Sequence, residues 1–504
     1  MARPGFVHEV NDRTPPLAVH HGTGVGRQSF PVGTSVVYPA EPAEPRGALR
    51  PAVRAALAEP LEETPLADRL RPGMRLTIAF GDTASAVPPM RLPDVRGQVV
   101  EEVLTVAADA GVDDVAMVCA RGLQRRLTEA ELVDLLGVRV FESFAPLGLI
   151  SQHDTEADDL VELAGARVNA RVAGSDLVVT VQATDDRTRT GAALLTELTG
   201  AADLAAVRGP DADPGAEAAL ADRLTGALPV FAVEVALDTH PFAPELGFLA
   251  TREWEWRLRD HAVVTGLRTS QRLLPDRARA TVMQRAQTAA TVLAVNAGRP
   301  GPVGAAGAAA LLAQHRVGVP EQVRTLVTGL PHVSPYGVGA WLNPLLSTHL
   351  ALHDAYGSHT GTPLVADGGA LIVFGSLERR FHRHHIATAD FFTDVLADAT
   401  DDAQVAAAEQ RFADDEWYQH LYRHSEAHHP RQPFQLWYAT AEARRRLSDI
   451  IWVGGDRQIC AAMGFRAAST LADALEMVES SDGLGYLHSP PLAVVDLPDA
   501  EPTP

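Results

Sequence analysis

The sequence contains no lysine, and all 43 of its basic residues are arginine. This absence excludes a lysine Schiff base, a Walker lysine, a lysine general base and any cofactor tethered through lysine. Only two cysteines, Cys119 and Cys460, are present, which excludes a disulfide framework and a metal site built from cysteine alone. No stretch offers 18 uncharged apolar residues, and the N-terminus lacks an apolar leader. We therefore expect a cytoplasmic protein with no membrane partner.

The remaining totals describe an acidic globular protein. The formal net charge of −21 argues against nucleic acid as a partner, because that partner requires clustered positive charge. A small carboxylate or phosphorylated substrate held by local arginines stays compatible with this charge, and a homo-oligomer is left open. With 504 residues, of which 46% are hydrophobic, the chain is too long for one core. Two domains are the expected arrangement.

Short apolar runs alternate with helical periodicity in the first half. Residues 75–80, 114–120 and 175–181 are typical of buried strands. Between them, residues 96–111 carry an apolar helical face that ends at Gly111, and Thr128 and Glu131 have the spacing of a capping box. Strands alternating with helices predict a mostly parallel, doubly wound sheet.

The second half repeats this style less regularly. Residues 324–329, 368–375 and 447–455 are typical of strands, and 469–480 of an amphipathic helix. The fold class predicted is α/β, with two doubly wound domains and an interdomain cleft. The expected domains are 1–250 and 316–504, joined by a helical region rich in Pro, Gly and Ala at 251–315, in which 297–310 is the best candidate for the linker.

Three loops should meet where the parallel strands end, because ligands of doubly wound sheets bind beyond the carboxyl ends of the strands. Arginines and helix-start amides suit a carboxylate or phosphate. The acidic residues of these loops include Asp82, the candidate for acid/base chemistry, and the residues expected to bind substrate are Gln124, Arg125, Gln182, Arg187 and Arg189.

At these loops the chain resembles the nickel-dependent lactate racemase family. "ARGLQRRLTEAEL" (120–132) resembles the family pattern Ala-Thr-Gly-Leu-His-Arg-x-x-Thr-Glu-x-Glu-Leu, and "SQHD" (151–154) resembles its His-Asp segment. "SDLVVTVQA" (175–183) resembles the strand before the family's site loop, and "GGALIVFG" (368–375) resembles part of its C-terminal domain. The resemblance implies a lactate racemase-like fold over most of residues 20–490.

The residues at which this chain departs from the family are the ones that carry the family's chemistry. The family holds a nickel-carrying pincer cofactor on a lysine, and a covalent nickel-pincer nucleotide is excluded here by the absence of lysine. Gln124 and Gln182 stand at positions of family histidines, and Ala84 and Ser85 replace its Thr-Arg. The family's tyrosine and lysine after "NP" (343–344) have no counterpart. The resemblance therefore implies the fold without the racemase chemistry, with the cofactor unknown and a divalent metal still a candidate.

Two histidine clusters could supply replacement chemistry. His384 and His385 follow a predicted strand and are expected to face the cleft. His420, His424 and His428 recur every four residues, a spacing that lets imidazoles on one helical face share a metal. The alternative is that these histidines bond to neighbouring carboxylates, and for residues 420–429 we expect that outcome.

The favoured hypothesis is an isomerase- or lyase-like enzyme acting on a small hydroxy acid or related carboxylate by acid/base chemistry. Its predicted catalytic residues are His153, Asp82, His384 and His385. Two alternatives stay open: a metal-dependent enzyme that uses the C-terminal histidines, and a non-catalytic protein that binds a small ligand on the same scaffold.

Overall fold

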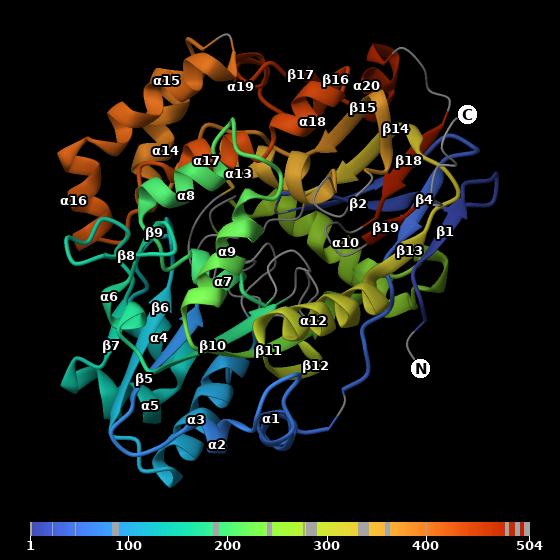
Figure 1. Ribbon diagram of the computed structural model, residues 1–504. Helices are drawn as coiled ribbons and strands as arrows, with labels where there is room; N and C mark the ends of the chain where they lie inside the picture. The colour runs from blue at the N-terminus through green and yellow to red at the C-terminus, as the bar shows by residue number, and fades with distance from the viewer. Residues whose placement is uncertain are drawn as a thin grey trace, which may run out of the picture.

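The computed structural model of the protein places two α/β units one above the other (Figure 1). It describes residues 3–22, 24–45, 47–82, 90–184, 191–238, 244–275, 278, 290–330, 342–357, 363–399, 401–478, 483–488 and 494–497.

The first unit is built on a six-stranded sheet, drawn mainly in blue and green in Figure 1. In spatial order its strands are β12 (Thr291–Gly298), β11 (Val230–Asp238), β10 (Leu177–Thr184), β5 (Arg75–Gly81), β6 (Asp114–Ala120) and β7 (Ile150–Gln152). All neighbours are parallel except β12, which runs antiparallel to β11. The predicted strands of the first half are thereby confirmed.

Helices cover both faces of this sheet. They are α1 (Leu49–Ala58), α2 (Leu66–Arg69), α3 (Val95–Asp109), α4 (Glu129–Leu136), α5 (Val138–Phe144), η1 (Ala145–Leu147), α6 (Ala170–Ala173), α7 (Ala193–Thr196), α8 (Ala201–Arg208), α9 (Ala216–Ala227) and α12 (Pro300–His315). Alternate residues of β10 enter two separate cores: Val179 packs with α1, α3 and α4, and Val178 packs with α7 and α9. This alternation is what a doubly wound sheet requires.

The predicted helix signals of this unit are confirmed. Thr128 and Glu131 form a capping box at the start of α4, and the helix ends at Gly137. Gly137 has φ +82°, a backbone conformation that favours glycine. The turn before α4 is therefore held in a defined geometry, which matters because this turn carries predicted site residues.

The second unit is built on a seven-stranded sheet. Its order is β1 (Phe6–Glu9), β4 (Ser35–Tyr38), β18 (Leu484–Leu487), β14 (Val323–Gly329), β15 (Val365–Phe374), β16 (Asp449–Val453) and β17 (Arg466–Ala468). Only the edge strand β1 is antiparallel. Outside the two large sheets, the described residues form three two-stranded ribbons: β2 (Leu17–His21) with β3 (Gly24–Gln28), β8 (Val161–Leu163) with β9 (Ala166–Val168), and β13 (Arg316–Gly318) with β19 (Val494–Asp496).

The helices of this unit also lie on both faces of their sheet. They are α13 (Pro344–His349), η4 (Leu350–Ala355), η6 (Arg383–His385), α14 (Ile386–Asp390), η7 (Phe391–Leu396), α15 (Asp402–Ala413), α16 (Glu416–His424), α17 (Gln432–Tyr438), α18 (Ala441–Arg446), α19 (Arg457–Ala462) and α20 (Leu471–Met477). Leu371 and Val373 of β15 pack with α13 and α17, whereas Ile372 packs with α20. Two α/β units, each with a mostly parallel sheet, confirm the predicted fold class.

Sheet membership differs from the predicted domain ranges at both ends of the first range. β1 and β4 join the second sheet, because β4 pairs with β18 near the C-terminus. β12, predicted within the connecting region, pairs instead with β11 in the first sheet. The segment between β11 and β12 contains η2 (Pro244–Ala250), η3 (Glu253–Glu255) and α10 (Leu258–Leu273), and it packs against β2 and β3 rather than linking one unit to the other along the chain.

The proposed linker at 297–310 is mostly helix. Pro300 stands at the first turn of α12, where its missing N–H costs nothing, and the alanines that follow favour a helix. The glycines allow close packing: a Cβ at residue 307 would lie 1.7 Å from Glu234 Oε1. The Gly/Ala composition thus serves helix–sheet contact. No helix among the described residues is both long and apolar enough to cross a membrane.

Candidate functional site

The carboxyl ends of three neighbouring parallel strands lie at one edge of the first sheet. Gly81 at the end of β5 is in register with Ala120 at the end of β6, and Phe80 of β5 with Val181 of β10. Asp82 follows β5 directly, Gln124 lies four residues beyond β6, and Gln182 is the third residue from the end of β10. The prediction that these strands end at the same edge is confirmed.

The turn after β6 is rigid. Buried Arg121 donates from Nε to the His153 carbonyl (2.6 Å) and from Nη1 to the Gln124 carbonyl (2.6 Å). Its guanidinium lies 4.0 Å from the ring centroid of Tyr422, a cation–π contact. The backbone of Gln124 is therefore fixed. Its side-chain Oε1 is buried and has no hydrogen-bond partner among the described residues, so this amide is a good candidate to contact a ligand.

Arg125 does not have the substrate-binding geometry predicted for it. Its side chain is 3% exposed and forms a double ion pair with Glu131, the residue that completes the capping box of α4. A paired and buried guanidinium anchors the helix start and does not reach a substrate. The other two predicted arginines, Arg187 and Arg189, lie outside the described residues.

His153 also differs from its predicted acid/base role. Its side chain is buried, Nε2 contacts the Thr199 carbonyl at 2.9 Å and Nδ1 contacts Asn169 Nδ2 at 3.3 Å. Burial lowers the pKa of His153 to about 4. With both ring nitrogens bonded to protein groups, His153 is a structural histidine that holds the segment after β7.

A buried carboxyl group that the sequence analysis did not single out lies beside this edge. Glu234 of β11 is in register with Gln182 of β10, so the two side chains share a face of the sheet. Glu234 is 1% exposed and accepts a hydrogen bond from the Gly191 N–H at 2.7 Å. Burial raises its pKa to about 7. The signal available in the sequence was one glutamate within the apolar strand "VFAVEVALD".

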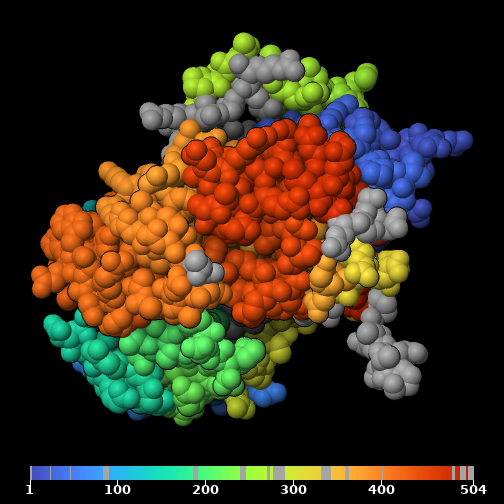
Figure 2. Space-filling model, turned by 90° about the horizontal axis from the view of Figure 1, so that it is seen from above, coloured from blue at the N-terminus to red at the C-terminus, as the bar shows by residue number. Residues whose placement is uncertain are grey.

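The two units meet where the turn after β6 contacts the segment from α16 to residue 429. Tyr422 Oη donates to the Gly122 carbonyl at 2.8 Å, and Arg423 pairs with Asp154 at 2.9 Å. His429 contacts Glu156 at 3.0 Å. Figure 2 shows the orange part of the second unit in contact with the teal and green part of the first. These contacts connect the predicted site turn of one unit to the histidine-rich segment of the other.

A cavity of about 660 Å³ lies at this junction. Arg126 and Thr128 line it from the first unit, and Arg383, His384 and Glu426 from the second. His384 Nε2 contacts Glu426 at 2.8 Å, and the pKa of His384 is lowered to about 4, chiefly by burial. His384 thus lies in an interdomain cavity, as the prediction that it faces the cleft requires.

His385 lies behind His384 and does not line the cavity. Its ring is 1% exposed, stacks on His428 at a centroid distance of 4.4 Å, and has no hydrogen-bond partner at either nitrogen among the described residues. Burial, with the nearby His382, lowers the pKa of His385 to about 3. The structure seals His385 from any substrate in the cavity, contrary to its predicted catalytic role.

The three histidines predicted as a low-odds metal set do not converge. Helix α16 ends at His424, so His428 leaves the helical face and is buried against His385. His420 and His424 are exposed, with ring centroids 4.8 Å apart. The described geometry therefore does not bring these three imidazoles together on one helical face.

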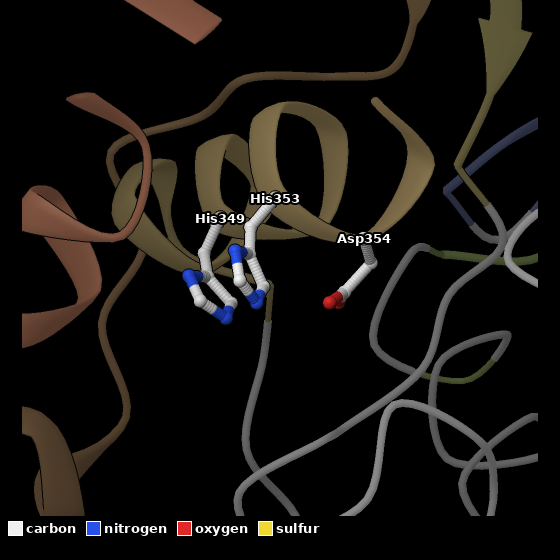
Figure 3. Close-up of side chains that lie close together, drawn as sticks. All are labelled: His349, His353 and Asp354. Carbon is white, nitrogen blue, oxygen red and sulfur yellow. The ribbon is translucent and has the colours of Figure 1, made fainter. Parts of the chain in front are cut away.

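A different trio does converge. His349, the last residue of α13, and His353 and Asp354 of η4 each offer one ligand atom, and these atoms lie within 4.8 Å of one another. Figure 3 shows both imidazoles projecting from the same side of the helix, with the Asp354 carboxylate turned toward them. The sequence analysis used this stretch only for its missing tyrosine and lysine. The pattern His-x-x-x-His-Asp was the signal that could have identified it.

The donor set at the strand edge does not fit a lysine-tethered nickel pincer. The chain has no lysine, and the described residues at the edge are a carboxylate and two amides, Asp82, Gln124 and Gln182. An amide hydrogen-bonds well but is a poor proton carrier near neutral pH. Any chemistry at this edge therefore has to proceed without a lysine-tethered nickel pincer.

Comparison with known proteins supports the fold. Residues 24–185 match the lactate racemase N-terminal domain family. The lactate racemase apoprotein from Thermoanaerobacterium thermosaccharolyticum has a similar structure, with a TM-score of 0.58 and 14% identity over 95% of this chain and 100% of that chain. A structural-genomics protein from Thermotoga maritima gives a TM-score of 0.48 and 11% identity over 91% and 100%. No curated protein is significantly similar in sequence.

The match over residues 24–185 covers β5, β6 and β10 and hence the edge that carries Asp82, Gln124 and Gln182. The structural likeness extends the shared fold to the second unit. Residues 24–185 are therefore similar to the lactate racemase N-terminal domain family, and the chain as a whole has a fold similar to that of the lactate racemase apoprotein.

Proposed function

We propose that this protein is an enzyme that acts on a small hydroxy acid or a related carboxylate by acid/base chemistry, without a lysine-tethered cofactor. The observation that supports this proposal is the shared edge of β10, β5 and β6, in a region similar to the lactate racemase N-terminal domain: Asp82 and Gln124 follow β5 and β6, and Gln182 lies near the end of β10. Ligands of such sheets bind at this edge.

Each of these residues has a role that its chemistry allows. The amides of Gln124 and Gln182 donate hydrogen bonds to a carboxylate or accept one from a hydroxyl group. We assign the acid/base role to Asp82 because it directly follows β5 at this edge, whereas His153 and His385 are buried. Arg96 supports the loop by donating to the backbone carbonyl of Asp82.

A second candidate function is a metal-dependent enzyme, and one observation favours it. The trio of His349, His353 and Asp354 supplies three convergent ligand atoms in the second unit. This replaces the exposed histidines of α16 as the C-terminal histidine site of the metal-dependent alternative.

The proposed function is tested by proton exchange at the carbon next to the carboxylate. The protein is incubated in D₂O with a panel of small α-hydroxy acids, and deuterium incorporation is followed by NMR. We expect exchange on at least one acid and a reduction of about 10²-fold or more in Asp82→Asn, the range typical of a lost general base. Asp113→Asn is the matched control, since Asp113 is an exposed aspartate outside the site.

The outcomes separate the hypotheses. Exchange that is equal in Asp82→Asn and wild type would remove Asp82 from the proposed mechanism. Saturable binding of an acid, seen as a thermal shift without exchange across the panel, would favour the non-catalytic binding protein. Absence of both binding and exchange would contradict the proposed substrate class.

A further inference from the structure

We propose that His349, His353 and Asp354 form a binding site for one divalent transition-metal cation, and that this cation takes the carboxylate and hydroxyl oxygens of a hydroxy acid. The metal site stands on the geometry below; the choice of ligand rests on the proposed function.

The helix geometry explains why these three residues converge. In a regular α-helix of 3.6 residues per turn, a residue five positions on lies about 140° around the axis, so Asp354 would point away from His349. Here α13 continues into η4, a π-helical segment in which the Tyr356 N–H donates to the Ala351 carbonyl five residues back, at 3.0 Å. Because a π-turn holds more residues than an α-turn, His353 and Asp354, which follow His349 by four and five residues, lie on either side of it on the same face of the helix.

The rings confirm this alignment. His349 and His353 are stacked, with centroids 4.8 Å apart and an interplanar angle of 21°. In Figure 3 the Asp354 carboxylate lies on the same side of the helix as the two rings. Bonds of about 2.0–2.2 Å at tetrahedral angles place two ligand atoms about 3.4 Å apart. Atoms near the present 4.8 Å limit must therefore move more than about 1 Å closer together, which requires side-chain rotation.

His353 and Asp354 are where the helix reaches accessible space, and His349 is largely buried beside them. From Pro344 to Leu352, and again at Ala355 and Tyr356, the helix is buried. His353 and Asp354 are partly exposed, and His349 is 9% exposed. An ion could therefore reach ligands that are fixed by a buried helix. Fixed ligands lose little conformational entropy on binding, which favours a tight site.

The donor set selects the kind of cation. Two imidazole nitrogens and one carboxylate oxygen suit borderline divalent ions of the zinc, cobalt and iron class rather than calcium or magnesium, which prefer oxygen ligands alone. Three protein ligands leave coordination positions open, the arrangement found in catalytic rather than structural metal sites. One carboxylate leaves a bound dication with a net positive charge, so an anionic ligand is attracted. An α-hydroxy acid offers two oxygens that chelate such an ion.

Cobalt(II) is the probe, because its visible absorption reports coordination by nitrogen and oxygen. The full chain is stripped with a chelator, and Co²⁺ is titrated into wild type, His353→Gln and Asp354→Asn. The matched control is the double variant His420→Gln/His424→Gln, which removes an exposed pair with the same four-residue spacing and the same 4.8 Å ring separation. Circular dichroism and the melting temperature of each metal-free variant verify folding.

We expect one equivalent of Co²⁺ in wild type and in the control, and affinity at least 10-fold weaker in His353→Gln and Asp354→Asn. Absence of Co²⁺ binding to wild type would overturn the site, as would binding that the control loses while folded trio variants retain it. Glycolate should shift the cobalt spectrum more than acetate, which lacks the hydroxyl; equal shifts would overturn chelation through that group.

The outcome is independent of the proposed function. One equivalent of cobalt at the trio together with no α-deuterium exchange on any hydroxy acid would support the metal site and contradict the proposed function. Exchange that survives complete removal of metal would leave the proposed function standing and overturn the role of the cation in binding the substrate.

Discussion

His385 and the histidines of α13–η4 belong to the same unit of the molecule but lie in opposite surroundings. His385 stacks on His428, with 1% of its surface exposed and a pKa lowered to about 3. His353 is partly exposed and lies beside a second imidazole and a carboxylate. Both histidines occur in clusters along the sequence, so clustering alone does not distinguish them.

The difference lies in the groups that surround each imidazole. Burial without a partner makes a histidine a neutral packing residue, because its protonated form cannot be solvated. A neighbouring carboxylate and access from outside make it available for ligand binding. Three substitutions test this comparison: one at a buried carboxyl group, one at a buried imidazole and one at the end of a regular helix.

The largest change in the free energy of unfolding is expected for a substitution of Glu234, whose carboxyl group is buried. Its pKa is raised from 4.5 to about 7, so the stability contributed by the neutral form is full below pH 4.5 and is lost as the pH rises through 7. Glu234→Gln keeps an oxygen that accepts the Gly191 N–H and cannot ionise. We expect this variant to exceed wild type by about 3 kcal/mol in free energy of unfolding at pH 8, and by less than about 1 kcal/mol at pH 5.

Chemical denaturation at the two pH values measures the difference. Glu217→Gln is a useful control, since Glu217 is a partly exposed glutamate in the same unit. A stabilisation of Glu234→Gln that is the same at pH 5 and pH 8 would show that Glu234 does not titrate as its burial requires.

The next effect, of opposite sign, is expected at His385. Its pKa is lowered from 6.5 to about 3, so the stability contributed by the neutral ring is full above pH 6.5 and is lost as the pH falls. The titratable or charged groups that act on the His385 ring are His382, His384 and Arg125, and its stacking partner is His428. His385→Phe keeps a stacking ring without a proton site.

We expect His385→Phe to gain about 2 kcal/mol relative to wild type on going from pH 8 to pH 5, measured by urea unfolding. His424→Phe alters an exposed histidine and should leave the pH dependence unchanged. Parallel pH profiles for wild type and His385→Phe would mean that solvent reaches the His385 ring.

Much of the fold followed from the sequence because local signals agreed with one another. The strands at β5, β6 and β10, the capping box of α4 and its end at Gly137 combine periodicity with residues that have one structural use. Strand pairing between distant segments was not predictable. Nothing in residues 35–38 indicates that β4 pairs with β18, or that β12 joins the first sheet.

The site was predicted less well, for a physical reason. Sequence placed Asp82, Gln124 and Gln182 at one edge because parallel strands impose it. It could not show that Arg125 is paired with Glu131, or that His153 bonds through both nitrogens, since these contacts depend on tertiary packing. The trio was missed because its convergence requires a π-turn, whereas a regular helix would direct Asp354 away.

The smallest effect is expected when the spacing of the trio is copied onto a regular helix. Ser425→Asp places a carboxylate directly after His424 and reproduces the pattern His-x-x-x-His-Asp at residues 420–425. Helix α16 is regular to its end, where the Ser425 N–H donates to the Leu421 carbonyl four residues back, and Ser425 itself is extended. An aspartate there would leave the helix in a different direction from the two rings. The test uses a His353→Gln background, which removes one ligand of the native trio. There we expect Ser425→Asp to change cobalt affinity less than about 3-fold, a difference of under about 1 kcal/mol. A new cobalt absorption band in this variant, with affinity near that of wild type, would show that sequence spacing is sufficient and that the π-turn of η4 is not needed.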